Sequence, residues 1–213
     1  MEESPFDTYA KIYDDWYEKH KMIYESELEA IRELMPDIIP GKSLEIGVGT
    51  GRFASELGIG YGLDPSQKMI GIAGKRGIEQ IIGVAEELPL KNSSIKLILM
   101  VTSLCFTDKE STFREIHRVL EPGGELIIAF IERNSLLGKE YRKKRSHKDF
   151  YRNAGFYSAS ELIKSLKDNC FQEPVFRQTL FRPPHEIKVP EKPLEGFGEG
   201  SFIVIKAINI KDW

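Results

Sequence analysis

The amino-acid sequence predicts an α/β fold, in which a mostly parallel sheet is flanked by helices. First, short β-type runs alternate with helical stretches from Lys42 onward, as in strands that are joined by crossover connections rather than hairpins. Second, the 213 residues are 41% hydrophobic and 10% aromatic, which suffices for one compact core. Third, no internal repeat or low-complexity segment interrupts this pattern. We therefore expect a single domain.

Residues 6–35 are predicted to be helical, because aromatic and aliphatic side chains recur there at helical spacing. The first stripe consists of Phe6, Tyr9, Tyr13 and Trp16, and the second of Tyr24, Leu28, Ile31 and Met35. Pro36 and the Ile-Pro-Gly sequence at 39–41 end the helical pattern.

Five strands and three helices are predicted in the next ninety or so residues. The strands are expected near residues 43–47, 59–63, 79–84, 95–101 and 126–131, and the helices near residues 51–58, 66–75 and 108–120. The last helix must end at Glu121-Pro122-Gly123-Gly124, because proline and paired glycines cannot continue it.

The pattern changes after Ile131. Residues 132–152 contain eight Lys and Arg against three acidic residues, which predicts a polar, mobile excursion. Ser158 and Glu161 have the spacing of a capping box, so a helix is expected to begin there. Residues 175–181 and 201–208 are predicted to be the last two strands, and the apolar side chains on both faces of the final strand indicate a central position.

Composition excludes several classes of function. Thirty Lys and Arg against 33 Asp and Glu give a net charge of −3, so we expect neither nucleic acid nor a membrane as partner. The longest apolar runs, 97–101 and 126–131, are far shorter than the roughly 18–20 residues of a membrane span. The amino terminus lacks the features of a secretory signal, which predicts a cytoplasmic protein.

Cysteine usage and the spacing of possible metal ligands are equally informative. Cys105 and Cys170 lie in apolar stretches of the sequence, so both are expected to be reduced, buried thiols. No group of His, Cys and acidic residues has the spacing of a metal site, and we expect a metal-free protein.

The strongest functional signal is a glycine-dense turn after the first predicted strand. Residues 43–51 read Ser-Leu-Glu-Ile-Gly-Val-Gly-Thr-Gly, which places Gly47, Gly49 and Gly51 between a buried strand and a helix. Glycine lets the backbone turn sharply and lets a ligand approach main-chain N–H groups at the start of a helix. Position 52 is Arg where a dinucleotide-binding fingerprint has its last glycine, so the pattern disfavours NAD.

Asp64 is the second functional signal. It ends the second predicted strand, 17 residues after Gly47, where a carboxylate can accept hydrogen bonds from both hydroxyls of a ribose. Alternatively, Asp64 merely caps the helix that follows Pro65 and Ser66. In combination with the glycine turn, we favour a ligand-binding role.

These segments resemble the class I S-adenosylmethionine (SAM)-dependent methyltransferases, nearest the small-molecule group that includes ubiquinone- and menaquinone-biosynthesis methyltransferases. The resemblance covers residues 9–131 and 198–205. It implies a Rossmann-like sheet of seven strands in one domain that has an amino-terminal helical lid. It divides the chain into the lid (1–40), a SAM-binding core (41–131), a basic insertion (132–157) and a final helix with the last two strands (158–213).

The resemblance also implies a function. The enzyme would transfer a methyl group from SAM to a nitrogen, oxygen or carbon atom of a small molecule and leave S-adenosylhomocysteine as the product. The residues that would bind the cofactor are Tyr13, Glu45, Gly47, Gly49, Gly51, Asp64, Pro65, Ser66, Met69, Ala85, Glu86 and Thr102. Two positions depart from the pattern: Val84 stands where many relatives have an aspartate that contacts the adenine, and Lys96 where relatives usually have a strand aspartate.

No residue stands out as a general base. The methyl group of a sulfonium is already activated, so an enzyme needs chiefly to place the acceptor in line and to exclude water. The candidates are Glu132, which follows the fifth predicted strand, and His147, in the basic segment; for each we favour a position away from the substrate. We expect the acceptor pocket between the lid, the loop after Ile131 and the proline-rich residues 182–200.

Two alternative functions stay open at this point. The chain could be a SAM-binding or sensing module without turnover, since no base is evident. It could also methylate RNA, for which the basic residues 133–152 are the sole support. The sequence does not define the oligomeric state.

Overall fold

The computed structural model describes residues 5–144, 154–172 and 174–211, and its centre is one sheet of eight strands. The strands are β1 (Ser43–Ile46), β2 (Tyr61–Asp64), β3 (Glu79–Ile82), β4 (Ile95–Val101), β5 (Leu120–Ile131), β6 (Val175–Thr179), β7 (Leu194–Glu195) and β8 (Phe202–Ile208). Their order is β3-β2-β1-β4-β5-β8-β6-β7. β1 to β5 are parallel, whereas β8 is antiparallel to both β5 and β6.

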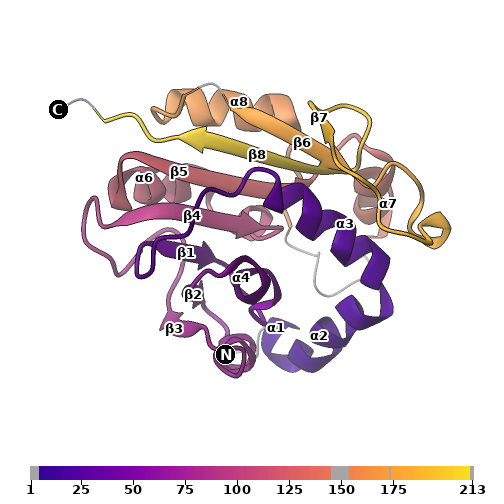
Figure 1. The fold of residues 1–213 in the computed structure, drawn as a ribbon, viewed down its shortest axis with the longest axis horizontal. Helices are drawn as coiled ribbons and strands as arrows, with labels where there is room; N and C mark the ends of the chain where they lie inside the picture. Colours follow the sequence, from indigo (N-terminus) through magenta and orange to yellow (C-terminus); the bar gives the residue numbers. More distant parts are fainter. Residues whose placement is uncertain (1–4, 145–153, 173, 212–213) are drawn as a thin grey trace.

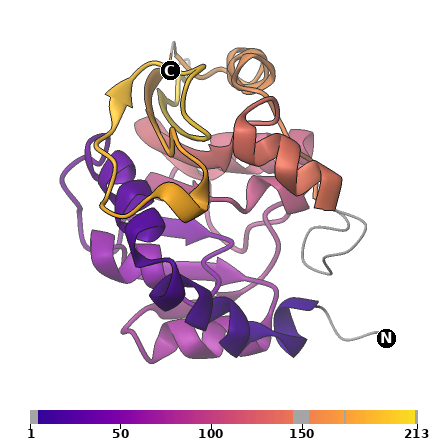
Figure 2. The ribbon, with the colours of Figure 1, turned by 90° about the vertical axis from the view of Figure 1, so that its right-hand side faces the viewer.

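Helices pack on both faces of this sheet (Figures 1 and 2). They are α1 (Pro5–Thr8), α2 (Ala10–Lys19), α3 (Lys21–Arg32), α4 (Arg52–Leu57), α5 (Gln67–Gly74), α6 (Lys109–Val119), α7 (Leu136–Lys144) and α8 (Ala159–Asp168), with one-turn 3-10 helices η1 (Leu104–Phe106) and η4 (Pro184–Glu186). The Rossmann-like α/β architecture predicted from the sequence is thereby confirmed.

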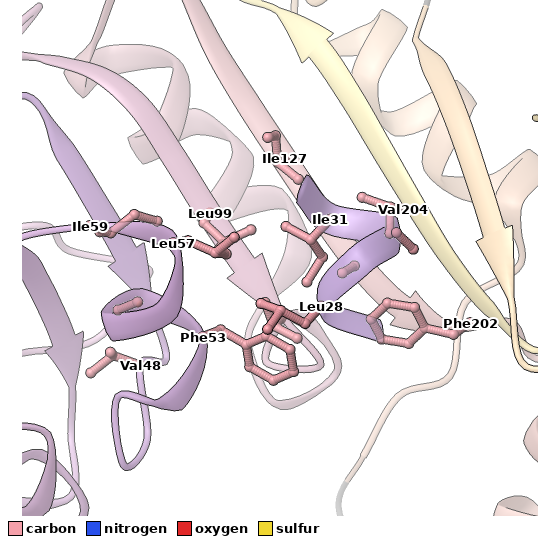
Figure 3. Close-up of a cluster of buried hydrophobic side chains, with 14 of the residues drawn as sticks. Leu28, Ile31, Val48, Phe53, Leu57, Ile59, Leu99, Ile127, Phe202 and Val204 are labelled. Atoms are coloured by element: carbon pink, nitrogen blue, oxygen red, sulfur yellow. The ribbon is translucent and has the colours of Figure 1, made fainter. Parts of the chain in front are cut away.

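The core is divided into two layers because side chains alternate along the strands. On β4, Leu99 and Val101 pack with α3, α4 and α5, whereas Ile98 and Met100 pack with α6 and α8. Figure 3 shows the first layer, in which Ile31 of α3 points toward Leu99 and Phe53 of α4 belongs to the same cluster. The sheet is therefore buried on both faces, as its nearly continuous apolar sequence requires.

The structure has one strand more than the seven expected. The additional strand, β7, contains only Leu194 and Glu195, pairs with Arg177 and Gln178, and is exposed at the edge of the sheet. A two-residue edge strand has no periodicity of its own, so its pairing depends on the tertiary position of the proline-rich loop.

The single helical stretch predicted over residues 6–35 is divided into α1, α2 and α3. The division between α2 and α3 falls at His20, whose ring stacks on Trp16 with centroids 4.3 Å apart and whose Nδ1 lies 2.9 Å from the Trp16 carbonyl oxygen. His20 leaves helical geometry, with φ −120° and ψ 40°, and the chain changes direction there. The segment predicted to be the lid, residues 1–40, contains all three helices, and its role as a lid stays a prediction; below, "the lid" denotes α1 and α2.

Two further expectations need correction. The basic excursion contains a helix, α7, in which Leu137 and Tyr141 face the apolar core; residues 145–153 of the same segment lie outside the described part of the chain. Neither cysteine is fully buried, because Cys105 is half-buried and Cys170 is exposed; both are free thiols. Cys170 follows the end of α8 with a left-handed φ of 64°, and that position leaves its side chain on the surface.

Candidate functional site

A cavity of about 660 Å³ lies at the carboxyl ends of β1, β2 and β4. One side of the cavity is formed by residues at the ends of these strands, namely Ile46, Asp64 and Val101. Parallel strands end at the same edge of a sheet, so residues far apart in the sequence meet there. The other side comes from α1, α2, α3 and α7, which contribute among others Tyr13 and Tyr141.

The glycine turn forms part of the cavity wall. Gly47 and Gly49 line the cavity and have φ values of 70° and 54°, in the left-handed region that glycine adopts without strain. The turn is held against β2 by a hydrogen bond of 2.7 Å from the Gly47 N–H to the Leu63 carbonyl oxygen. A Cβ on Gly47 would lie 2.3 Å from the Cβ of Ser103, so only glycine fits there.

Asp64 links the end of β2 to this turn. Its Oδ2 accepts a hydrogen bond of 2.9 Å from the Gly49 N–H, and its Oδ1 accepts one of 2.8 Å from the Ser66 N–H. Burial raises the pKa of Asp64, these two N–H groups oppose the rise, and the charge of Asp7 adds to it. Each carboxylate oxygen keeps a further lone pair, so Asp64 can accept hydrogen bonds from a ligand's hydroxyl groups.

The structure brings most of the predicted cofactor residues to the cavity. Besides those of the turn and Asp64, they are Tyr13, Pro65, Met69, Ala85, Glu86 and Thr102. Thr102 has a left-handed φ of 49° directly after β4, an unusual conformation for a residue with a Cβ. Val84, which replaces the aspartate of many relatives, also lines the cavity, and the neighbouring Glu86 accepts a hydrogen bond from the Asp108 N–H at 2.7 Å.

Three of the predicted residues do not line the cavity, namely Glu45, Gly51 and Ser66. Glu45 is buried behind the turn; burial raises its pKa well above the ordinary value, a hydrogen bond from Ala54 opposes the rise, and the charge of Asp64 adds to it. Gly51 precedes α4 and packs against Ala73. Ser66 caps α5 by accepting a hydrogen bond from the Met69 N–H. These residues support the wall from behind.

Ion pairs attach the lid to the glycine turn. Asp14 of α2 accepts hydrogen bonds from Arg52 Nε at 2.8 Å and from Arg76 Nη2 at 3.0 Å, and Arg76 also donates to the Thr50 carbonyl oxygen. Burial tends to raise the pKa of Asp14, but the hydrogen bonds from Arg52, Thr50 and Arg76 outweigh it, and the pKa is lowered. The carboxylate is therefore held in its charged form.

Tyr13 of the lid lies beside the glycine turn. The position of a Cβ on Gly49 would lie 3.8 Å from Cε1 of Tyr13. The Tyr13 hydroxyl lies 2.9 Å from the Tyr17 hydroxyl, and burial raises the pKa of Tyr13 to about 12 despite that hydrogen bond. Tyr13 is thus a neutral phenol beside the glycine turn.

Sequence reasoning missed Glu27 and Tyr141, both of which line the cavity. Glu27 is 7% exposed and lies on the buried face of α3 with Ile23 and Ile31. The spacing of these three residues, four apart, was a usable signal, because it places a carboxyl group in an apolar stripe. Tyr141 follows Leu137 by four residues in α7, the same spacing within the segment interpreted as an excursion.

Of the two suggested bases, Glu132 does not line the cavity as its position in the sequence implied. The Glu132 carboxylate accepts a hydrogen bond of 2.5 Å from the Asn134 N–H, and Glu132 is not part of the cavity lining. Its position after β5 makes it a cap for the following turn. His147 lies outside the described residues. His117 lies 2.6 Å from Asn209 Oδ1 and is a packing residue.

The residues present fit SAM, which contains an amino-acid tail, a sulfonium and an adenosine. Glycines 47 and 49 leave the backbone of the turn open to a ligand, and Asp64 keeps lone pairs for ribose hydroxyls. Val84 and Ala85 offer apolar contact to a purine. In the described part of the chain, no three His, Cys or acidic residues form a metal site, and no helix there is long and apolar enough to cross a membrane.

Comparisons with known proteins point to one family. The family model described as "Methyltransferase domain" matches residues 44–128. A crystal structure from Thermotoga maritima is 43% identical, covers 96% of this chain and 98% of that chain, and superposes with a TM-score of 0.92. That protein is described as a SAM-dependent methyltransferase and a possible histamine N-methyltransferase.

Other relatives extend the similarity across organisms. An uncharacterized protein of Methanocaldococcus jannaschii is 43% identical over 207 residues, which are 96% of this chain and 98% of that protein. A putative methyltransferase of Haloferax volcanii, solved in complex with the Trm112 activator, is 18% identical with a TM-score of 0.73 and covers 99% of this chain and 100% of that chain. At that identity, the likeness is one of fold.

Proposed function

This chain belongs to the SAM-dependent methyltransferases, and from that premise we propose that its acceptor is a small molecule that it methylates at nitrogen, oxygen or carbon. The observation that supports this most is the cavity of about 660 Å³, which continues from the glycine turn to the side chains of α3 and α7. Small-molecule sites have volumes of about 300–1,000 Å³. The lid contributes Tyr13 and Trp16 to its wall, which favours a compact acceptor over a polymer.

The roles of the chain's residues follow from their positions. Bound SAM supplies a methyl group on a positively charged sulfur, which an acceptor can attack directly. Asp64 would accept hydrogen bonds from the ribose, and the turn at Gly47 and Gly49 would lie against the amino-acid tail. The lid and the aromatic side chains on it would exclude water and orient the acceptor.

The description of the Thermotoga relative as a possible histamine N-methyltransferase supports a nitrogen acceptor, since that protein shares 43% of its residues with this chain. The finer resemblance to ubiquinone- and menaquinone-biosynthesis enzymes, which would favour a quinone precursor, stays a prediction.

Incubation with methyl-labelled SAM tests the proposal. We expect labelled product in the small-molecule fraction of a metabolite extract, and its loss when Asp64→Ala is used instead. Labelled RNA in a parallel incubation would favour the RNA alternative, which also requires RNA binding that strengthens steeply as salt is lowered. Binding of SAM without label in any fraction would favour the sensing alternative.

A further inference from the structure

We propose that Glu27 binds the ammonium group of the acceptor and removes its proton, so that the acceptor of this enzyme is a compact amine. The inference rests on the proposed function, because it assigns the acceptor end of the same cavity.

Glu27 is an acidic residue on the buried, mostly apolar face of α3. It is 7% exposed, lies on α3 between the buried residues Ile23 and Ile31, and lines the cavity. Among the described residues, no hydrogen bond or ion pair reaches its carboxyl group, whereas the buried Glu191 is paired with Arg182 at 2.6 Å. A largely buried carboxyl group that has no protein partner is costly unless a ligand or water reaches it, and the position of Glu27 on the cavity wall lets a bound ligand supply that partner.

Aromatic rings surround this carboxyl group. Tyr13, Trp16 and Tyr17 of α2 and Tyr141 of α7 line the same cavity. The three residues Glu27, Tyr13 and Tyr141 line one cavity, and the charge of Glu27 contributes, after the larger effect of burial, to raising the pKa of both tyrosines. Aromatic faces attract ammonium groups, and a carboxylate beside them adds direct charge pairing.

The electrostatics of the cavity select the same kind of ligand. The described residues that line it include the acidic Glu27, Asp64 and Glu86, and among them there is no Lys, Arg or His. A phosphate or carboxylate on the acceptor would meet like charge and no donor cation. A cationic acceptor meets opposite charge at Glu27 once this carboxyl group has lost its proton, and binding of the cation itself favours that loss.

The proton chemistry of Glu27 suits an amine. Burial raises its pKa to about 8, close to the range in which a proton can move between a carboxylate and an ammonium group. Transfer to Glu27 leaves the nitrogen with a free electron pair. That pair forms the new N–C bond while the bond between the methyl carbon and sulfur breaks and its electrons stay on sulfur. The product carries the positive charge, and Glu27 releases its proton to water afterwards.

One other cation could pair with Glu27, namely the ammonium group of the donor's own amino-acid tail, because Tyr13 adjoins both Glu27 and the glycine turn. The charge of Glu27 also raises the pKa of Tyr141, which lies on α7 and not in the glycine turn. This favours the ammonium group of the acceptor over that of the donor as the partner of Glu27. The two sources are separable, because S-adenosylhomocysteine retains that ammonium group.

The test compares Glu27→Gln with Glu29→Gln, which removes a charge from the exposed side of the same helix. Calorimetry with S-adenosylhomocysteine should give affinities within about twofold of wild type for both variants. A loss of tenfold or more for Glu27→Gln alone would assign Glu27 to the donor and overturn the inference. Unchanged affinity also demonstrates that the variant is folded.

The acceptor is tested with metabolite extract separated by cation exchange into a basic and a non-basic fraction. We expect wild type and Glu29→Gln to label products from the basic fraction, and Glu27→Gln to lose about 100-fold or more of that activity at pH 7. The residual activity of Glu27→Gln should rise about tenfold per pH unit, as the free amine becomes available. Label confined to the non-basic fraction, or equal labelling by Glu27→Gln, would overturn the inference and leave the proposed function intact. Absence of label from both fractions would count against the proposed function itself.

Discussion

Gly47 illustrates, at the scale of single residues, how a missing side chain shapes the site. The backbone of the turn passes so close to Ser103 that there is no space for a Cβ, and the left-handed φ of 70° would strain any other residue. Gly58 has a similar φ of 74°, but a Cβ added to Gly58 would meet nothing within 4 Å. A comparison of alanine substitutions at Gly47 and Gly58 therefore separates the cost of the steric collision from the cost of the backbone strain.

We predict that Gly47→Ala lowers the free energy of unfolding by at least about 3 kcal/mol, because strain and collision add. Gly58→Ala should cost only about 1–2 kcal/mol, the backbone strain alone. Urea denaturation measures both. Equal losses for the two variants would show that Ser103 does not press on the turn, whereas recovery of stability in Gly47→Ala combined with Ser103→Gly would identify the contact directly.

Glu27 has a thermodynamic signature that needs no substrate. Because its folded pKa of about 8 exceeds the ordinary value of 4.5, the folded protein binds this proton more tightly than the unfolded chain. The contribution to stability is therefore complete below about pH 4.5 and is lost as the pH rises through 8.

We predict that Glu27→Gln gains stability relative to wild type between pH 5 and pH 8.5, by on the order of 2–4 kcal/mol. Thermal unfolding of the ligand-free proteins across this range measures the difference. Glu29→Gln is the control and should run parallel to wild type at every pH. A Glu27→Gln curve that is also parallel would mean that the buried carboxyl titrates normally.

At the scale of elements, the lid is positioned by charge as well as by aromatic packing. Arg52 and Arg76 come from the start of α4 and the end of the α5 region, and both converge on Asp14 of α2. The Asp14 and Arg52 side chains are only 17% and 13% exposed, so water screens this pair less than a surface ion pair. Asp15, the next residue, is exposed and provides a matched control.

We predict that Asp14→Asn loosens the lid, lowers the free energy of unfolding by about 1–2 kcal/mol and weakens S-adenosylhomocysteine binding. The control Asp15→Asn should change none of these three properties. Because the hydrogen bonds lower the folded pKa of Asp14, its contribution is present above about pH 4 and is lost as the pH falls through that lowered value. Limited proteolysis of residues 5–19, with calorimetry, is the measurement. Equal resistance of Asp14→Asn and Asp15→Asn to proteolysis would contradict the role of Asp14 in anchoring the lid.

The elements also show what the sequence could predict. The capping box of Ser158 and Glu161 was predictable because both hydrogen bonds connect residues three apart, and it is confirmed. β7 was not predictable, because two residues adopt a strand only through pairing with β6. The break at His20 arises from the contact of its ring and Nδ1 with Trp16, which no pattern of apolar residues encodes.

The same reasoning applies to the site. The positions of Gly47, Gly49 and Asp64 on the cavity wall were predictable because strand, turn and carboxylate follow one another within about twenty residues. The spacing of Glu27 from Ile23 and Ile31 indicated a carboxyl group in an apolar stripe, but that this stripe faces a cavity depends on α3, α2 and α7 meeting there. Glu132 was suggested by its position after β5, but its carboxylate turns to the Asn134 N–H instead.

At the scale of the whole molecule, the sheet order places the ends of β1, β2 and β4 side by side at one edge. The strands β8, β6 and β7 extend the sheet on the far side of β5, away from β1 and β2 (Figure 1). The cavity is therefore bounded by the ends of β1, β2 and β4 and by the lid, α3 and α7. We infer that donor recognition depends on the parallel half of the sheet and that acceptor recognition depends on the helices around the cavity.

The most direct test is a calorimetric titration of S-adenosylhomocysteine into wild type, Asp64→Ala and the control Asp15→Ala, with folding of each variant checked by circular dichroism. We predict saturable binding to wild type and to the control, and a loss of about 1–3 kcal/mol in binding free energy for Asp64→Ala, since the ribose hydroxyls lose their acceptor. Failure of wild type to bind, or binding to Asp64→Ala at wild-type affinity, would contradict the proposed site.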